Sequence, residues 1–179
     1  NNLPGALSVI AIAGKSNLFN APETYMNKIS ANVSENDVVD LDFSIKKNID
    51  NLSQYKNKRP EDLTVCILDR PRHLEIINEL KDYNVNLKLI SDGDISGALL
   101  VTNEKYKVDL FLGIGGGPEG VLAASALDAY NCFFQAKFLF ESEEEKTRAN
   151  KKAKSLEKLT NTESKSIFDQ IQSNSPWEK

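Results

Sequence analysis

The sequence predicts an α/β fold with a largely parallel sheet. From residue 64 onward, short apolar runs alternate with segments whose apolar residues recur every three or four positions. The first pattern is typical of buried strands and the second of amphipathic helices, so their alternation indicates βαβ units. The 179 residues, 40% of them hydrophobic and 27% charged, suffice for one sizeable core with a tail.

Five segments are predicted strands because each is a short apolar run bounded by polar or glycine-containing turns. They lie at residues 7–13, 64–68, 85–90, 108–112 and 133–140. Residues 23–29 are ambiguous between a helical turn and a short strand, and residues 30–37 are predicted to form a loop.

The first predicted helix runs from a cap at Ser44 to about Tyr55, because Ile45, Ile49 and Leu52 form one apolar stripe. Pro60 opens a short helical turn. The next helix ends near residues 83–84, and its inner face is predicted to carry Leu74, Ile77 and Leu80. Further helices are predicted at residues 95–102 and 121–130, at residues 143–148 with the lysines that follow (an exposed helix of mixed charge), and at residues 164–171.

Composition excludes several classes of protein. The net charge of −4 argues against a nucleic-acid-binding face. No apolar run approaches membrane-spanning length, and no basic segment precedes the apolar residues 6–13, as a signal peptide would require. Cys66 and Cys132 have no metal-ligand spacing and are expected to be small core residues in a reducing compartment.

Polar or glycine-rich loops follow three successive predicted strands, at residues 69–73, 91–94 and 113–120. The carboxyl ends of parallel strands meet at one edge of a sheet, where ligands gather. The three loops therefore predict a ligand site at this edge.

The third loop, residues 113–120, is predicted to break a strand and lead into a helix. Such a junction leaves unpaired N–H groups at the positive end of the helix dipole, which suits a phosphate. A carboxylate in this loop, Glu119, would repel the phosphate unless a cation lay between them. The loop therefore predicts a phosphate and a divalent metal ion together.

Two other interpretations of this loop stay open. Gly115, Gly117 and Gly120 satisfy G-x-G-x-x-G, and Glu141 follows at about the distance expected for a dinucleotide-binding turn. Alternatively, the glycines serve a tight strand–helix connection for backbone reasons only.

The first loop places Arg70 and Arg72 on either side of a proline, and guanidinium groups suit phosphate oxygens. The alternative is a pair of surface arginines balanced by nearby acids. His73, the only histidine, is expected to have an ordinary surface or capping role. In the second loop, Asp92 and Asp94 are candidates for a metal ion or sugar hydroxyls, and Asp94 also suits the N-cap of the next helix.

Taken together, these motifs closely resemble class II fructose-1,6-bisphosphatase, a metal-dependent sugar phosphatase. The match covers roughly residues 3–149 in order and spacing. It is carried by Asn20-Ala-Pro with Tyr25-Met, by Leu-Thr-Val-x-Ile-Leu with Arg70-Pro-Arg-His73, by Asp92-Gly-Asp94, and by Gly113-Ile-Gly-Gly-Gly-Pro-Glu-Gly-Val121.

The resemblance implies a layered α/β sugar-phosphatase sandwich related to inositol monophosphatases. It implies hydrolysis of the 1-phosphate of fructose 1,6-bisphosphate, within gluconeogenesis or the Calvin cycle, and in some relatives of sedoheptulose 1,7-bisphosphate. It further implies Mn²⁺ or Mg²⁺ as cofactor, a cytoplasmic location and a homo-oligomer, a dimer or tetramer, for the full-length enzyme.

By position, the resemblance also implies roles for individual residues. Glu119 resembles a metal ligand near the scissile phosphate. The residues that resemble contacts to phosphate are Tyr25, Arg70, Arg72 and the amides of Gly115, Gly116 and Gly117. The residues that resemble contacts to the sugar are Asp92 and Asp94.

In the family, the remaining metal carboxylates, including an Asp-Pro-x-Glu-Gly-Thr motif, lie upstream of where this chain starts. We therefore expect an internal fragment, almost inactive by itself. Residues 1–60 would end an N-terminal subdomain, residues 61–141 would form the α/β subdomain with the substrate and metal loops, and residues 142–179 a charged helical tail. The alternatives are a catalytically silent sugar-phosphate-binding module and a dinucleotide-binding oxidoreductase domain.

Overall fold

The computed structural model describes residues 10–12, 21–35, 37–140 and 142–147. Within these residues five strands form one sheet in the order β3-β2-β4-β1-β5. β3, β2 and β4 are parallel neighbours, whereas β1 lies antiparallel between β4 and β5. Four of the five strands therefore point the same way. The strands are β1 (Tyr25–Ala31), β2 (Thr64–Leu68), β3 (Asn86–Ile90), β4 (Leu110–Gly116) and β5 (Phe133–Leu139).

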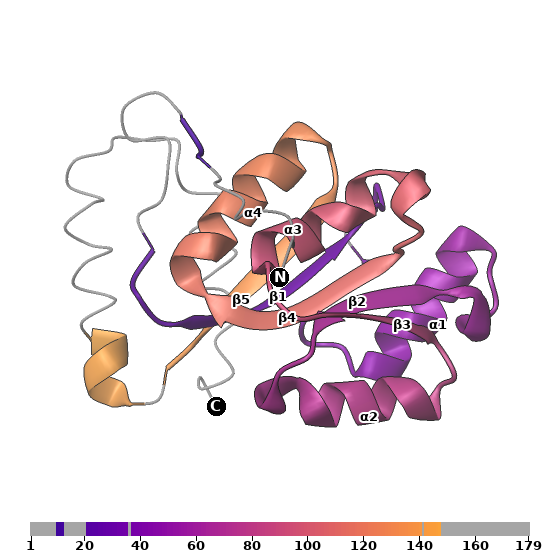
Figure 1. Ribbon diagram of the computed structural model, residues 1–179, viewed down its shortest axis with the longest axis horizontal. Helices are drawn as coiled ribbons and strands as arrows, with labels where there is room; N and C mark the ends of the chain where they lie inside the picture. The colour runs from indigo at the N-terminus through magenta and orange to yellow at the C-terminus, as the bar shows by residue number, and fades with distance from the viewer. Residues whose placement is uncertain (1–9, 13–20, 36, 141, 148–179) are drawn as a thin grey trace, which may run out of the picture.

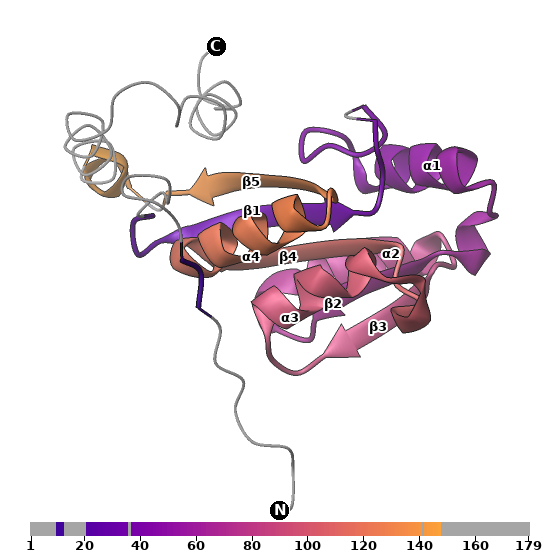
Figure 2. The same cartoon turned by 90° about the horizontal axis from the view of Figure 1, so that it is seen from above.

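Helices cover both faces of the sheet (Figures 1 and 2). On one face lie α1 (Ile45–Lys56) and α2 (Leu74–Asp82), and on the other α3 (Asp94–Leu99) and α4 (Gly117–Ala129). Successive side chains of a strand point to opposite faces. Val65 and Ile67 accordingly pack with α1 and α2, whereas Cys66 and Leu68 pack with α3 and α4. This layered α/β/α arrangement confirms the predicted fold class.

Local signals placed several elements correctly. The Ser44 side chain accepts a hydrogen bond from the Lys47 N–H and caps α1, which ends at Asn57 in the left-handed conformation (φ 50°). Pro60 opens a 3₁₀ turn as predicted. The 3₁₀ turns are η1 (Pro60–Asp62), η2 (Pro71–His73), η3 (Leu100–Thr102) and η4 (Glu104–Tyr106).

The predictions for residues 30–31 and for Leu74 are wrong. Ser30 and Ala31 belong to β1 and not to a loop, because the Ser30 hydroxyl donates to the Ala98 carbonyl (3.1 Å) and is thereby accommodated under α3. Leu74 is not on the inner face of α2 but 57% exposed, because it is the first residue of a helix that begins beyond the end of β2. Ile77 and Leu80 are buried as predicted.

The glycine segment does not break the strand: β4 continues through Gly116 and α4 begins at the next residue. Gly93 (φ 94°) is the one glycine with positive φ among the described residues, so the glycines of this segment are not needed for unusual backbone angles. They provide space instead. A Cβ atom added to Gly113 would lie 2.7 Å from the Phe111 ring, and one added to Gly120 would lie 2.6 Å from the Met26 sulfur.

Some predictions concern segments that the structure describes only in part or not at all. Of the predicted strand 7–13 only residues 10–12 are described, and they are not in a strand. The predicted helix 164–171 lies outside the described residues, whereas residues 143–147 are helical as expected. The predicted division of the chain into subdomains at residues 60 and 141 stays a prediction. Across the described part of the chain, no helix has the length and apolar character needed to cross a membrane.

Candidate active site

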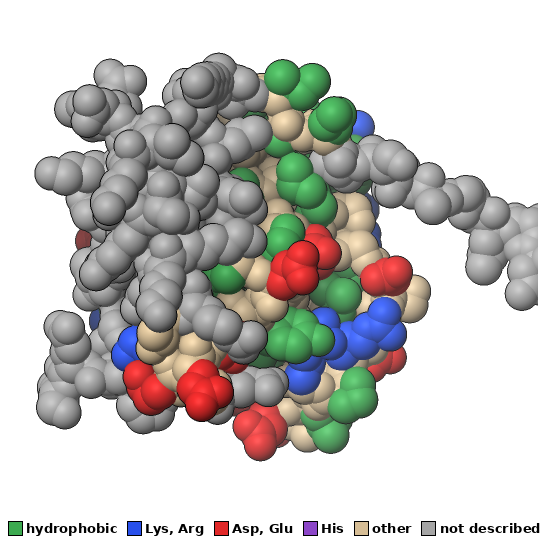
Figure 3. Space-filling model, turned by 90° about the vertical axis from the view of Figure 1, so that its left-hand side faces the viewer, with side chains coloured by type: hydrophobic (Ala, Val, Ile, Leu, Met, Phe, Trp, Pro, Cys, Tyr) green, Lys and Arg blue, Asp and Glu red, His purple; other side chains and the backbone are tan. Residues whose placement is uncertain are grey.

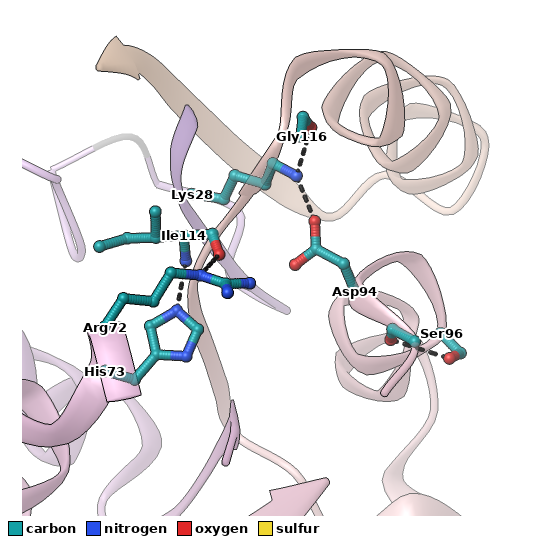
Figure 4. A network of polar contacts seen from close by, with 8 residues as sticks. Lys28, Arg72, His73, Asp94, Ser96, Ile114 and Gly116 are labelled. Carbon is teal, nitrogen blue, oxygen red and sulfur yellow. Dashed lines mark hydrogen bonds and ion pairs between the residues drawn. The ribbon is translucent and has the colours of Figure 1, made fainter. Parts of the chain in front are cut away.

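The site is built where β2 and β4 separate. These strands pair only at Val65–Leu110 and Cys66–Phe111, after which β2 ends at Leu68 and β4 continues to Gly116. The loop after β2 then occupies the exposed edge of β4 with side chains (Figure 4).

Two residues of that loop bond one residue of β4. The Ile114 N–H donates to His73 Nε2 (2.8 Å), and Arg72 Nε donates to the Ile114 carbonyl (2.7 Å). The two side chains therefore continue the hydrogen bonding that β2 no longer provides, and they fix the loop of residues 69–73 to the end of β4.

His73 is fully buried, and its second nitrogen, Nδ1, lies 2.8 Å from the Leu68 carbonyl. Because Nε2 accepts a backbone N–H, the proton of the neutral ring must be on Nδ1, which donates to Leu68. Burial lowers the pKa of His73 below its ordinary value. The expected surface or capping role is wrong, because both ring nitrogens bond the backbone at the point where the sheet opens.

Arg72 and Tyr25, two of the predicted phosphate contacts, lie side by side. The Arg72 guanidinium carbon is 5.3 Å from the centre of the Tyr25 ring, close enough for a cation–π contact. Tyr25 is 47% exposed and pairs with Gly116 across β1 and β4. Figure 3 shows this end of the molecule, where Lys and Arg side chains gather beside hydrophobic and acidic ones. The exposed, positively charged Arg72 side chain is thus held near Gly116 at the carboxyl end of β4.

Arg70 and Asp92 form a second group at the neighbouring strand ends. Arg70 Nη2 lies 3.6 Å from Asp92 Oδ1, with the side chains 41% and 90% exposed. Exposed ion pairs contribute between nothing and about 1 kcal/mol. Either side chain can therefore turn toward a ligand at little cost.

Asp94 is the first residue of α3 and follows the left-handed Gly93. Its carboxylate Oδ2 pairs with the ammonium group of Lys28, which also donates to the Gly116 carbonyl (2.8 Å; Figure 4). The predicted N-cap role for Asp94 is wrong, because Gly93 occupies the cap position and the carboxylate is bound to Lys28 and not to a helix amide.

Glu119 lies in the first turn of α4 and is exposed. Its carboxylate reaches back over Gly116, because a Cβ atom added to Gly116 would collide with Glu119 Oε2. The neighbouring Gly117 N–H already donates to the Thr24 carbonyl (2.7 Å). Glu119 therefore lies at the same junction of β4 and α4 that Lys28 fixes from inside.

Comparison with known proteins decides the family. The family model described as bacterial fructose-1,6-bisphosphatase, glpX-encoded, matches residues 1–166. The chain belongs to this family. The resemblance derived from the sequence motifs is thereby confirmed.

Curated relatives of this fructose-bisphosphatase family agree. A D-fructose 1,6-bisphosphatase class 2/sedoheptulose 1,7-bisphosphatase from Synechocystis sp. is 38% identical over 143 residues, which are 80% of this chain and 41% of the relative. Proteins of the same description from Microcystis aeruginosa and Crocosphaera subtropica are 37% and 36% identical over 143 residues. The chain spans less than half the length of these relatives.

The fructose-bisphosphatase family implies a divalent cation. Among the described residues, however, no group of three or more His, Cys, Asp or Glu side chains is placed to hold a metal ion. Glu119 is a single carboxylate, and divalent cations take several oxygen ligands. The described part of the chain therefore offers Glu119 as a candidate ligand but no complete metal site.

The sequence analysis missed Lys28. It lies in the segment that was ambiguous between turn and strand, yet it is fully buried and bonds both Asp94 and Gly116. A signal was present, since Lys28 alternates with Met26 and Ser30 on one face of the strand while Ile29 and Ala31 lie on the other. A charged residue within such a strand is rarely buried without a partner.

Proposed function

We propose that the whole protein hydrolyses the 1-phosphate of fructose 1,6-bisphosphate to fructose 6-phosphate and inorganic phosphate. The observation that carries this proposal is the Arg72–Tyr25 pair at the end of β4, fixed by Ile114 and His73, in a chain that belongs to the fructose-bisphosphatase family. The names of the relatives support sedoheptulose 1,7-bisphosphate as a second substrate.

The exposed groups suggest how the substrate would be held. Arg70 and Arg72 would bind phosphate oxygens through charged hydrogen bonds, with the Tyr25 ring keeping Arg72 in place. Asp92 and Asp94 would accept hydrogen bonds from sugar hydroxyls.

The glycine residues 115–117 would let a phosphate approach the start of α4 without obstruction by side chains. Because the Gly117 N–H is already bonded to Thr24, the dipole of the 13-residue helix α4 would act on the phosphate more than this amide does.

Glu119 would supply one ligand to the divalent cation, which we propose to be Mn²⁺ or Mg²⁺. When bound, such a cation supplies positive charge opposite the phosphate oxygens and activates water. The role of this chain is then to bind and orient the sugar bisphosphate at the end of β4.

Calorimetric titration of the 179-residue chain with fructose 1,6-bisphosphate tests the proposal. We expect Arg72→Gln to weaken binding about tenfold to a hundredfold, the value of a hydrogen bond to a charged group. Arg59→Gln is the matched control, because Arg59 is also exposed but pairs with Glu61 and Asp62 before the amino-terminal end of β2. Equal affinities of Arg72→Gln and the wild-type chain would contradict the proposal.

Phosphate release separates the phosphatase from the two alternatives. The 179-residue chain should release almost no phosphate by itself, and the whole protein should do so only with a divalent cation. Binding without cation-dependent hydrolysis by the whole protein would indicate the silent binding module. Protection of the chain by NAD(P) against thermal unfolding would indicate the oxidoreductase, although Gly115 lies within β4 and not in a turn.

We also propose, from the family resemblance, a cytoplasmic homo-oligomer, a dimer or tetramer, that serves gluconeogenesis or the Calvin cycle. Light scattering of the whole protein measures its assembly state, and cell fractionation measures its location.

A further inference from the structure

Lys28 is a charged residue in the interior of the protein. It lies in the middle of β1, between β4 and β5, and its side chain is 0% exposed. A buried ammonium group is costly unless it is paired and hydrogen-bonded. The burial of Lys28 therefore has to be explained by the groups that its ammonium bonds.

Lys28 bonds two groups of the candidate site from the inside: the Asp94 carboxylate and the Gly116 carbonyl. Gly113 lies opposite Lys28 in the β1–β4 register. A Cβ atom on Gly115 would lie 2.5 Å from Asp94 Oδ2, and one on Gly120 would lie 3.2 Å from Lys28 Cε. The absence of side chains at these glycines leaves the space in which the ion pair lies.

The second oxygen of Asp94, Oδ1, is different. It is buried and has no hydrogen-bond donor among the described residues. In Figure 4 this carboxylate lies across from Arg72, beside the end of β4. A carboxylate oxygen without a donor is suited to accept a hydroxyl hydrogen bond.

We propose that Lys28 is a positioning residue for sugar recognition: it fixes Asp94 so that Oδ1 accepts a hydrogen bond from a hydroxyl group of the sugar, and it holds the Gly116 carbonyl at the start of α4. Because Lys28 is completely buried, it acts through Asp94 and does not touch the ligand. This inference rests on the proposed sugar bisphosphate function.

Calorimetric titration with two probes tests this role: fructose 1,6-bisphosphate, which carries hydroxyl groups, and inorganic phosphate, which tests phosphate binding without the sugar. Lys28→Met should weaken binding of the sugar bisphosphate about tenfold to a hundredfold, as expected for a lost hydrogen bond to a charged group. Its affinity for inorganic phosphate should be unchanged.

Lys58→Met is the matched control, since Lys58 also pairs with a buried aspartate, Asp109, which directly precedes β4 at the other end of the strand. It should leave both affinities unchanged. An equal loss of sugar bisphosphate binding in the two lysine variants would show a general effect on the fold and overturn the inference.

The double variant Lys28→Met/Asp94→Asn decides the case if Lys28→Met alone does not fold. It should bind the sugar bisphosphate no more weakly than Asp94→Asn, because Lys28 acts through Asp94. Weaker binding by the double variant than by Asp94→Asn would overturn the inference. A wild-type chain that does not bind the sugar bisphosphate would contradict the proposed function itself, whereas unchanged binding by Lys28→Met would contradict only the role of Lys28.

Discussion

One aspartate lies at each of two opposite ends of the sheet, the buried Asp109 and the partly buried Asp94, and they are bonded differently. Asp109, just before β4, accepts hydrogen bonds from Lys58 (2.7 Å) and the Thr64 N–H (3.0 Å), one on each carboxylate oxygen. Asp94, at the opposite end, pairs through one oxygen with Lys28, and its other oxygen has no donor within the described ranges. Both oxygens of the Asp109 carboxylate are hydrogen-bonded, whereas the Asp94 carboxylate can still accept a hydrogen bond on its second oxygen.

The lysines differ as well. Lys58 is 41% exposed and Lys56, 3.4 Å from Asp109, is 20% exposed, so both can turn to water if the carboxylate is lost. Lys28 has no exposed surface. Loss of the aspartate partner is therefore expected to cost more for Lys28 than for Lys56 and Lys58.

The largest expected effect is that of Asp94→Asn. It leaves the Lys28 ammonium buried without a counter-charge and should lower the free energy of unfolding by about 3–5 kcal/mol. Urea denaturation followed by circular dichroism measures this change. The double variant Lys28→Met/Asp94→Asn should recover part of the loss, because no buried charge remains. A double variant less stable than Asp94→Asn would contradict the view that the unpaired charge of Lys28 causes the loss of stability.

Asp109→Asn should cost less, about 2 kcal/mol, because it weakens charged hydrogen bonds while the lysines stay solvated. Burial raises the pKa of Asp109, but the hydrogen bonds from Lys58 and Thr64 and the charge of Lys56 outweigh it, so the pKa lies below its ordinary value. The folded carboxyl thus binds its proton less readily than the unfolded one.

The contribution of Asp109 is therefore fully present above its ordinary pKa and is lost as the pH falls toward the folded-state pKa. Acid titration of the unfolding free energy should show a shallower decline in Asp109→Asn than in the wild-type chain. Parallel declines would contradict this role.

Gly115→Ala tests the space beside Asp94. The added methyl group would lie 2.5 Å from Asp94 Oδ2, and such overpacking costs about 1–3 kcal/mol. Gly97→Ala is the matched change, because the atoms nearest to its methyl group would belong to Ile90, at 2.7 Å, and to the Phe111 ring, at 2.9 Å. Both variants should lose stability, but Gly115→Ala should lose more of its affinity for fructose 1,6-bisphosphate. Equal affinities of the two variants would argue against a role for the position of Asp94.

The smallest expected effect is a pH dependence from His73. Burial lowers its pKa below the ordinary value of 6.5, so the unfolded chain binds a proton at a higher pH than the folded chain. The stability contribution is fully present above about 6.5 and is lost as the pH falls toward the folded-state pKa. Denaturation midpoints of the wild-type chain should fall across this range, and those of His73→Gln should fall less. A steeper fall in His73→Gln would contradict the buried neutral ring.

Much of the fold could be predicted from local patterns. The apolar run at residues 64–68, the Ser44 cap and the proline at position 60 each gave the observed element, because backbone hydrogen bonding and amphipathic spacing are encoded within a few residues. The motif spacing also gave the family. The failures lie at Lys28, His73 and Asp94, whose partners are 66, 41 and 66 residues away in the chain.

The sequence by itself determined the alternation of strands and helices, the family and the loops that carry arginine, aspartate and glycine, because these depend on residue type and spacing. The tertiary structure alone decided that the glycines provide space, that His73 bonds the open edge of β4 and that a buried lysine holds Asp94. The physical reason is that burial and hydrogen-bond partnership depend on which distant strands become neighbours, and the order β2-β4-β1 brings these residues together.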